Sequence, residues 1–308
     1  MRILVTGASG LVGAALVPAL ATAGHRVRRL VRGRPGGTDE FRWEPGSGWL
    51  DPAALAGCEA VVHLAGESIA AGRWTRRRKE RIRGSRVAGT RLLAAAIAGA
   101  VPPPRVMICA SAVGYYGDRG DELLVEASAP GEGFLAELVR DWEAASEPPA
   151  RAGIRVVHLR LGMVLSRQGG ALPRLLLPFG LGLGGPFGSG RQWTSWIALG
   201  DLVAAIAHVL VTTGLEGPVN AVAPGSVTNR EFARTLARVL GRPARLTMPG
   251  WALRLLLGEM GQELLLASQR VSPERLLASG FEFREAELEG ALRDIARRPR
   301  PEHAASKR

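Results

Sequence analysis

Short apolar runs alternate with amphipathic, helix-like segments through the first half of the chain. The apolar runs predict β-strands at residues 3–6, 27–31, 60–64, 105–110 and 155–161. Between them, apolar residues recur at helical spacing in segments 11–24, 85–100 and 133–153. Because crossovers between parallel strands are almost always right-handed, this alternation predicts an α/β, Rossmann-type doubly wound parallel sheet.

The pattern changes after about residue 165. Glycines and prolines are frequent in residues 171–193, which favours irregular structure. An apolar helix over 198–212 and a strand over 219–224 should return to the sheet, and Thr228-Asn-Arg-Glu231 matches a capping box that opens a helix. We therefore predict a Rossmann domain over residues 1–165 with 198–225 and a smaller α+β substrate-side unit over 166–197 with 226–296. The basic tail, residues 297–308, is expected to be disordered.

Composition narrows the function classes. The net charge of +12 comes almost entirely from arginine, since Lys79 and Lys307 are the only lysines. The basic residues concentrate in segment 73–86 and in the tail, but no aromatic platform, helix-turn-helix or zinc finger accompanies them, which disfavours nucleic acid as a partner. Cys58 and Cys109 are too far apart for a CxxC site and no metal-ligand spacing occurs, so we expect no metal.

No segment approaches the ~20 apolar residues of a membrane span, and the first apolar run stops at a glycine before it could form a signal-peptide core. We therefore expect a cytoplasmic protein without a membrane partner. A homodimer is an arrangement that the sequence allows.

A glycine pattern follows the first predicted strand. Gly7, Gly10 and Gly13 lie between that strand and a helix, the context in which such glycines admit a tight turn and a close pyrophosphate. NAD sites usually carry Asp or Glu at the end of the second strand, but residues 2–38 contain no carboxylate and the strand ends in Val-Arg32-Gly-Arg34. A guanidinium there favours a 2′-phosphate, so the sequence predicts NADP(H), with two exposed loop arginines as the alternative.

The motifs TGASGLVG, HLAG, GTRLL and SAVGYYG occur in this order. With them the chain resembles the extended short-chain dehydrogenase/reductase superfamily, in its branch of sugar-nucleotide epimerases and dehydratases. It is most similar to an atypical epimerase-family subgroup, YfcH-like, with a C-terminal domain of unknown function; GYYGD, DWE at 141–143 and SQRVSPERLLASGFEF carry this resemblance. It covers residues 1 to about 296 and implies an NADP-binding, oxidoreductase- or epimerase-like protein.

The resemblance also implies a set of cofactor contacts. The phosphate loop would be formed by Gly7, Ser9, Gly10, Leu11, Val12 and Gly13, and Arg32 would contact the adenosine phosphate. The edge of the cofactor would be lined by Leu64, Ala65, Gly66 and Glu67, and the nicotinamide end by Met163 and Val164. Arg86 replaces an asparagine that the family usually carries, and it would lie in or near the same crevice.

The chain departs from the family at the catalytic residues. Short-chain dehydrogenases use a tyrosine whose phenol is acidified by a lysine four residues later. The only tyrosines here are Tyr115 and Tyr116, and neither lysine stands four residues after them. In the segment that should carry the pair, GFLAELVRDWE, Phe or Leu replaces tyrosine and Leu or Val replaces lysine. Ala112 stands where the catalytic Ser or Thr is usual, and Ser111 is one residue early.

Two interpretations follow. The chain is an NADP-dependent enzyme on an unidentified small molecule, with Tyr115, Tyr116 and Ser111 as candidate catalytic groups, or it is a non-catalytic NADP-binding regulatory or interaction protein. For the first, Arg174, Arg191 and Gln192 are candidate substrate contacts, and Trp193 and Trp196 are either stacking surfaces or core. Packing that holds the loop is the alternative role of the tyrosine pair.

Overall fold

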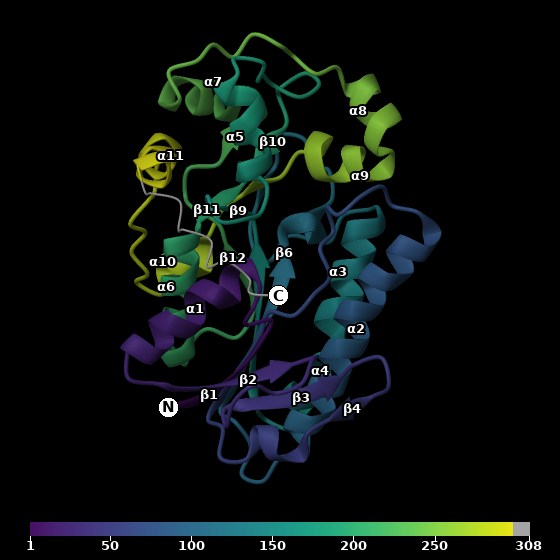
Figure 1. The fold of residues 1–308 in the computed structure, drawn as a ribbon, viewed down its shortest axis with the longest axis vertical. Helices are drawn as coiled ribbons and strands as arrows, with labels where there is room; N and C mark the ends of the chain where they lie inside the picture. The colour runs from purple at the N-terminus through teal and green to yellow at the C-terminus, as the bar shows by residue number, and fades with distance from the viewer. Residues whose placement is uncertain (298–308) are drawn as a thin grey trace.

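The structure is a computed structural model that describes residues 1–297 (Figure 1). All residues of the predicted basic tail except the first lie outside this described range. A central eight-stranded sheet has the order β12-β8-β6-β5-β1-β2-β3-β4, and β3–β4 is its antiparallel pair. Its strands are β1 (Arg2–Thr6), β2 (Arg26–Val31), β3 (Glu40–Glu44), β4 (Trp49–Leu50), β5 (Ala60–His63), β6 (Val106–Ala112), β8 (Arg155–Leu161) and β12 (Gly217–Ala221). The predicted Rossmann-type fold is confirmed.

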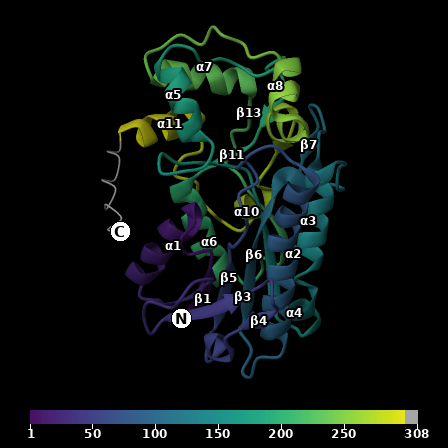
Figure 2. The same ribbon diagram turned by 45° about the vertical axis from the view of Figure 1, so that its right-hand side comes forward.

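Helices cover both faces of this sheet (Figures 1 and 2). Helices α1 and α6 lie on one face and α2, α3 and α4 on the other. Alternation along β1 explains the arrangement: Ile3 and Val5 pack into the core beneath α1 and α6, whereas Leu4 packs into the core beneath α2. The helices are α1 (Leu11–Thr22), α2 (Arg76–Ala98), α3 (Phe134–Ala144), α4 (Glu147–Arg151), α5 (Leu172–Gly180), α6 (Leu199–Val211), α7 (Asn229–Val239), α8 (Gly250–Leu257), α9 (Glu259–Gly261), α10 (Glu274–Ala278) and α11 (Leu288–Arg297).

Short elements complete the chain. Turns of 3₁₀ helix at Pro52–Leu55 and Val113–Tyr116 and a π-helical turn at Gln262–Leu266 join the longer elements. Among residues 1–297, three two-stranded pairs lie outside the main sheet; they are formed by β10 (Trp193–Thr194) with β13 (Val227–Thr228), β11 (Trp196–Ala198) with β9 (Met163–Leu165), and β14 (Arg270–Val271) with β7 (Leu123–Leu124).

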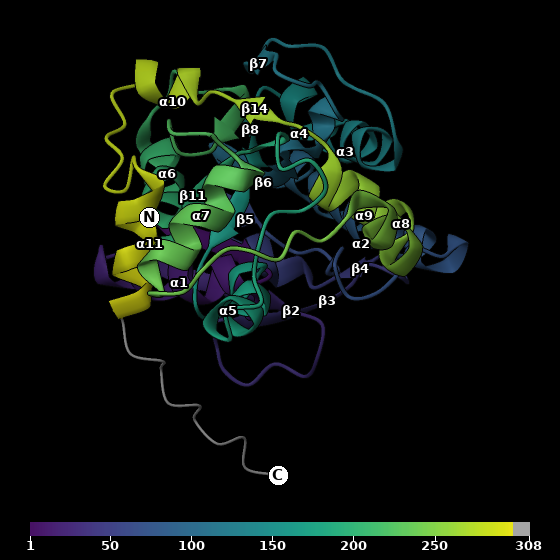
Figure 3. The same ribbon diagram turned by 90° about the horizontal axis from the view of Figure 1, so that it is seen from above.

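Helices α5, α7, α8 and α11 gather at one end of the molecule, beyond the sheet (Figures 1 and 3). The core beneath α5, α7 and α11 includes Trp196, Phe232, Leu236 and Leu292, all buried. The predicted capping box at the start of α7 is confirmed: the Thr228 hydroxyl accepts the Glu231 backbone N–H, and the Glu231 carboxylate accepts the Thr228 N–H. The division into domains stays a prediction.

Several elements differ from the sequence prediction. The single helix predicted over 133–153 is divided into α3 and α4 by a turn at residues 145–146. Helix α2 begins at Arg76 rather than at residue 85, because the Thr75 side chain caps it and the basic run continues as helix. Helix α5 lies inside the segment predicted to be irregular. A proline is tolerated in its first turn, and Leu172 and Phe179 are buried in a core shared with α7 and α11. We call residues 166–197 and 226–296, the smaller unit of the prediction, the C-terminal unit.

Strands β3 and β4 were not predicted. Both strands lie at the edge of the sheet, and Trp43 is the one buried residue of β3. A charged edge strand of this kind lacks the apolar run by which strands are recognised in a sequence. Cys58 and Cys109 are buried, free core residues. Within residues 1–297, no helix is long and apolar enough to cross a membrane.

Candidate functional site

The loop between β1 and α1 brings backbone N–H groups to the carboxyl end of the sheet. Gly7 has a φ of +68°, and a Cβ there would lie 2.8 Å from the Leu64 carbonyl carbon. A Cβ on Gly13 would lie 2.2 Å from the Gly7 carbonyl oxygen. Helix α1 starts after Gly10, which makes no side-chain capping hydrogen bond. The amino end of α1 is therefore shaped for an anion, because its first N–H groups have no capping side chain.

Residues predicted to contact the cofactor surround this loop. Ser9 is exposed, and Leu11 and Val12 are half-buried at the start of α1. The segment after β9 crosses above them, since a Cβ on Gly169 would lie 3.4 Å from the Leu11 side chain. Met163 and Val164 are half-buried in β9, which pairs with β11 and extends the carboxyl end of β8.

The carboxyl end of β2 carries unpaired cations. Arg32 and Arg34 are exposed, and neither makes a hydrogen bond or ion pair with any residue in the described range. By contrast, Arg26 at the other end of β2 pairs with Asp39 at 3.1 Å. The guanidinium of Arg32 is thus free to bind an anionic group beside the phosphate loop.

The segment after β5 is held by arginines of α2. The Arg86 guanidinium donates to the Glu67 carbonyl oxygen at 2.9 Å and lies 5.1 Å from the Trp142 ring, and burial lowers its pKa to about 10. Arg78 pairs with the Glu67 carboxylate. A Cβ on Gly66 would lie 3.3 Å from the Arg86 guanidinium carbon. Arg86 therefore fixes the backbone of the loop that follows Ala65. Its guanidinium is engaged with the chain itself and is not a free cation in the crevice.

A buried hydrogen-bond chain beneath the loop was not foreseen from the sequence. The Thr6 hydroxyl accepts the backbone N–H groups of Leu64 and Ala65, both at 3.1 Å, so its own proton goes to His63 Nδ1 at 2.7 Å. His63 Nε2 then donates to the Thr90 hydroxyl at 3.0 Å. This arrangement requires a neutral imidazole, and burial lowers the pKa of His63 to about 4. The histidine of the HLAG motif was the available signal.

The neutral state of His63 predicts a pH-dependent stability. Because its pKa is about 4 in the folded chain and has the ordinary value of 6.5 in the unfolded chain, the unfolded chain binds more protons between these values. The free energy of unfolding should be intact above pH 6.5 and fall by about 2 kcal/mol between pH 7 and pH 5 through this group alone. Urea unfolding at each pH measures it.

A His63→Gln variant should lose that part of the slope. If this variant does not fold, an NMR titration of the wild-type imidazole still decides: a titration midpoint at or above the ordinary value of 6.5 contradicts the prediction.

The tyrosine pair lies over a buried ion pair. Arg160 makes a bidentate pair with Glu143, with Nε–Oε1 and Nη2–Oε2 both at 2.9 Å. The Tyr116 hydroxyl accepts from Arg160 Nη1 at 3.0 Å and donates to Asn220 Oδ1 at 2.7 Å. The Arg160 guanidinium carbon stands 3.5 Å from the centre of the Tyr115 ring.

This network limits the candidate catalytic groups. Tyr116 is fully buried, and burial raises the pKa of its phenol despite Arg160. Ser111 donates to Glu143 Oε1 at 2.6 Å and is itself buried. Both hydroxyls are therefore committed to the Arg160–Glu143 pair. Tyr115, by contrast, is half-buried, and its hydroxyl makes no hydrogen bond within the described chain.

The places of the missing tyrosine and lysine are apolar. Phe134, Leu135 and Leu138 of α3 are buried in a cluster with Trp74 of the loop before α2 and Met260 of α9. The Glu263 carboxylate accepts the backbone N–H groups of Phe134 and Leu135 at 2.9 and 2.8 Å, so the C-terminal unit caps α3. Burial raises the pKa of Glu263 against the effect of these hydrogen bonds.

A pocket of about 390 Å³ opens at this junction. It is bounded by the loop after β6, by the start of α3 and by the C-terminal unit, and its polar lining includes Asp118, Glu132, Glu263 and Gln269. Ligand sites in open α/β sheets lie at the carboxyl ends of the strands, which is where the loop after β6 stands. This pocket is the candidate substrate site.

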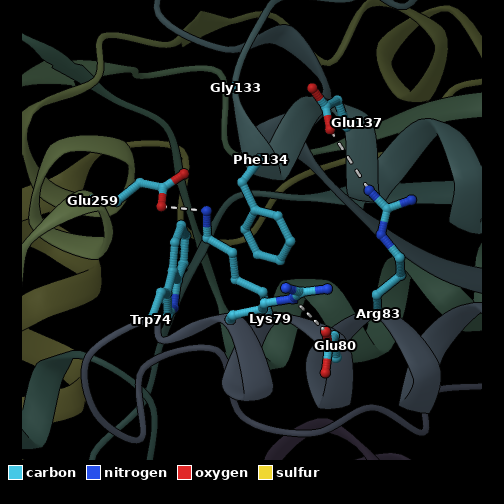
Figure 4. Close-up of a pocket in the computed structure, with 9 residues that line it drawn as sticks. Trp74, Lys79, Glu80, Arg83, Gly133, Phe134, Glu137 and Glu259 are labelled. Carbon is cyan, nitrogen blue, oxygen red and sulfur yellow. Dashed lines mark hydrogen bonds and ion pairs between the residues drawn. The ribbon is translucent and has the colours of Figure 1, made fainter.

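A larger pocket, of about 620 Å³, lies among α2, α3 and α9 (Figure 4). Its cations are neutralised: Lys79 pairs with Glu259, Arg76 with Glu80 at 3.1 Å, and Arg83 with Glu137 at 3.7 Å. An anion would have to displace these carboxylates. Of these three ion pairs, Arg76–Glu80 lies within α2, Arg83–Glu137 joins α2 to α3, and Lys79–Glu259 joins α2 to α9.

The predicted substrate-side residues have mixed positions. Arg174 reaches from α5 to the Ala70 carbonyl oxygen at 2.9 Å, and Arg191 is exposed. Gln192 is buried and donates to the backbone oxygens of Phe187 and Leu265, and Trp196 is completely buried core. The ring nitrogen of Trp193 donates to Asp121 at 2.8 Å. In the part of the chain that the structure describes, no group of three or more His, Cys, Asp or Glu could hold a metal.

Comparison with known proteins extends this picture. Residues 3–221 match the NAD dependent epimerase/dehydratase family, and residues 248–295 match a domain of unknown function, DUF1731. Epimerase family protein SDR39U1 of Homo sapiens is 40% identical over 96% of this chain and 99% of its own length. Epimerase family protein Mb2239 of Mycobacterium bovis is 43% identical over 96% of this chain and 98% of its own length.

Solved structures agree. The crystal structure of human SDR39U1 (isoform 2) with NADPH has a TM-score of 0.88 at 39% identity and covers 96% of this chain and 99% of that chain. The nucleoside-diphosphate sugar epimerase of Corynebacterium glutamicum has a TM-score of 0.80 at 38% identity, with 96% of this chain and 58% of that chain covered.

Proposed function

Because the chain belongs to the NAD dependent epimerase/dehydratase family, we propose that it binds NADP(H) and acts as an oxidoreductase or epimerase-like enzyme on an unidentified small molecule. The observation that carries the proposal is the phosphate loop: glycines that exclude side chains, an uncapped helix start and a free arginine at the end of β2. The related human protein crystallised with NADPH supports the same cofactor.

The residues around the loop fit this cofactor. We propose that the N–H groups of Ser9, Leu11, Val12 and Gly13 hold the pyrophosphate and that Arg32 holds the 2′-phosphate. The Gly10 N–H donates to the Gly7 carbonyl oxygen at 2.9 Å and so shapes the loop. Leu64, Ala65, Gly66 and Glu67 would line its edge, with Met163 and Val164 near the nicotinamide. When bound, NADPH supplies a hydride, and the chain's own residues orient the reactants and exclude water.

Proton transfer needs a group other than the usual tyrosine. Tyr115 is the candidate whose hydroxyl has no hydrogen-bond partner in the described chain. The hydroxyls of Tyr116 and Ser111 are both hydrogen-bonded to the Arg160–Glu143 pair. The Arg160 guanidinium packs against the Tyr115 ring, so the buried ion pair holds this ring in place while its hydroxyl stays without a partner in the described chain.

Arg32 predicts cofactor preference. Replacing Arg32 with Gln should weaken NADPH binding about tenfold, or about 1.4 kcal/mol, and leave NADH binding unchanged, since only NADPH carries the 2′-phosphate. Fluorescence titration of cofactor-stripped protein with each nucleotide measures both. Arg26→Gln is the matched control at the other end of β2 and should change neither affinity. Equal wild-type affinities for NADPH and NADH would refute the assignment.

A second function has its own support. The apolar side chains in place of the tyrosine and lysine, together with the buried Tyr116, favour a non-catalytic NADP-binding regulatory or interaction protein. Incubation with 4-deuterated NADPH and a panel of carbonyl compounds separates the two functions. Deuterium in a product supports the enzyme, whereas tight NADPH binding without transfer to any compound supports the regulator. Failure to bind either nucleotide contradicts both.

A further inference from the structure

An exposed apolar surface lies on the C-terminal unit, over α5, α8 and the segment that leads into α8. Eight large apolar side chains there are between 41% and 70% exposed: Leu177, Leu181, Leu183, Leu246, Met248, Trp251, Leu255 and Leu256. We call this set the apical surface. Figure 1 shows its elements, α5, α8 and the segment that leads into α8, at the end of the molecule away from β2 and β3.

The segments that carry the apical surface are joined. Residues 181–188 run beside residues 243–248, where the Gly188 N–H donates to the Met248 carbonyl oxygen at 2.9 Å and the Met248 N–H to the Pro186 carbonyl oxygen at 3.0 Å. Helix α8 follows directly. On α8, Leu253 is buried at 2% exposure while Trp251 and Leu255, one turn apart, point to the opposite side. The inner face of α8 is therefore buried through Leu253. Its outer face carries exposed apolar side chains that have no packing partner among residues 1–297.

The charge of these segments has one sign. Residues 172–191 and 242–258 contain Arg174, Arg191, Arg242, Arg245 and Arg254 and no carboxylate. The neighbouring acids are already engaged, since Glu231 caps α7 and Glu259 pairs with Lys79. Arg191, Arg242 and Arg245 lie on these segments without a carboxylate partner in the described chain, and all three are exposed.

We propose that the apical surface binds the surface of an anionic phospholipid bilayer. Leucines and a tryptophan enter the interface, and the arginines contact the lipid phosphates and carboxylates. Tryptophan is favoured at the boundary between acyl chains and headgroups, and Arg254 follows Trp251 by one helical turn. No helix of the described chain crosses the membrane in this arrangement. The sequence expectation of no membrane partner rested on spanning segments and a signal-peptide core, and neither concerns a surface that lies on a bilayer.

Other occupants fit less well. In a two-fold dimer the same surface meets itself, which would bring two sets of arginines together with no carboxylate from these segments to pair with them. A helical peptide needs a groove, and neither of the two pockets described above is lined by a residue of the apical surface. The surface thus matches a broad, anionic and apolar partner.

Vesicle co-sedimentation of the full-length protein tests the proposal. Binding to phosphatidylcholine vesicles that contain phosphatidylserine should exceed binding to pure phosphatidylcholine about tenfold or more. Trp251→Ser, and separately Arg242→Gln with Arg245→Gln, should each reduce the binding about tenfold. The control variant, Arg91→Gln with Arg105→Gln, removes the same charge from two exposed sites outside the apical surface and should leave vesicle binding unchanged.

Three outcomes would overturn the proposal. One is no preference for anionic vesicles, and another is equal loss in the control variant. The third is a concentration-dependent dimer in sedimentation velocity that Trp251→Ser abolishes, which assigns the surface to a second copy. NADPH affinity should stay unchanged in all these variants, so this test is independent of the proposed cofactor.

Discussion

Replacing Glu143 with alanine is expected to lower the free energy of unfolding by about 3–5 kcal/mol. Glu143 neutralises Arg160, which is only 3% exposed and donates two charge-assisted hydrogen bonds to that carboxylate. Burial lowers the pKa of Arg160, but the hydrogen bonds to Glu143 outweigh it and the net shift is upward, so Arg160 keeps its charge at any working pH. The variant leaves that charge buried without a counterion.

Urea denaturation measures the loss. Glu147→Ala is a matched control four residues further along, because Glu147 pairs with Arg151 in an exposed ion pair at 2.7 Å. Its removal should change stability by about 0.5 kcal/mol or less. Adding Arg160→Met to Glu143→Ala should recover part of the loss, since it removes the unpaired charge. Similar losses for Glu143→Ala and Glu147→Ala would show that the buried pair contributes no more than a surface pair.

The same pair explains why this part of the site could not be predicted. Arg160, Glu143, Tyr116 and Asn220 come from β8, α3, the turn after β6 and β12. The bond between Tyr116 and Asn220 joins residues 104 positions apart. A tyrosine in a glycine-rich loop suggests catalysis when its neighbours in space are unknown. Only the tertiary fold shows that its hydroxyl is already used.

Local features were predictable because local rules determine them. The phosphate-loop glycines stand within one turn, and each has a steric reason that the spacing already implies. The capping box of α7 is equally local. By contrast, α5 forms because Leu172 and Phe179 find a core supplied by α7 and α11, and β3 forms because β2 offers it an edge. Such elements depend on partners that a sequence window does not contain.

The second large effect is expected at the phosphate loop. Replacing Gly13 with alanine should weaken NADPH binding about 100-fold, or about 2.7 kcal/mol. The new Cβ would lie 2.2 Å from the Gly7 carbonyl oxygen and 2.7 Å from the Ala8 Cα, both backbone atoms. The loop can relieve this clash only by moving away from α1, which misaligns the N–H groups proposed to hold the pyrophosphate. Charged hydrogen bonds are each worth about 1.5–3 kcal/mol, so losing one or two accounts for the effect.

Two further glycines make the test specific. In Gly84→Ala the added Cβ meets nothing within 4 Å in α2, so NADPH affinity should be unchanged while the helix gains up to about 1 kcal/mol. In Gly10→Ala the Cβ would lie 3.2 Å from the Gly7 oxygen, a milder conflict that should weaken binding by an intermediate factor. Circular dichroism establishes that each variant is folded before titration. If NADPH affinity decreases from Gly84→Ala through Gly10→Ala to Gly13→Ala, binding depends on the close approach of the loop to α1. If folded Gly13→Ala binds NADPH as tightly as the wild type, the nucleotide binds elsewhere.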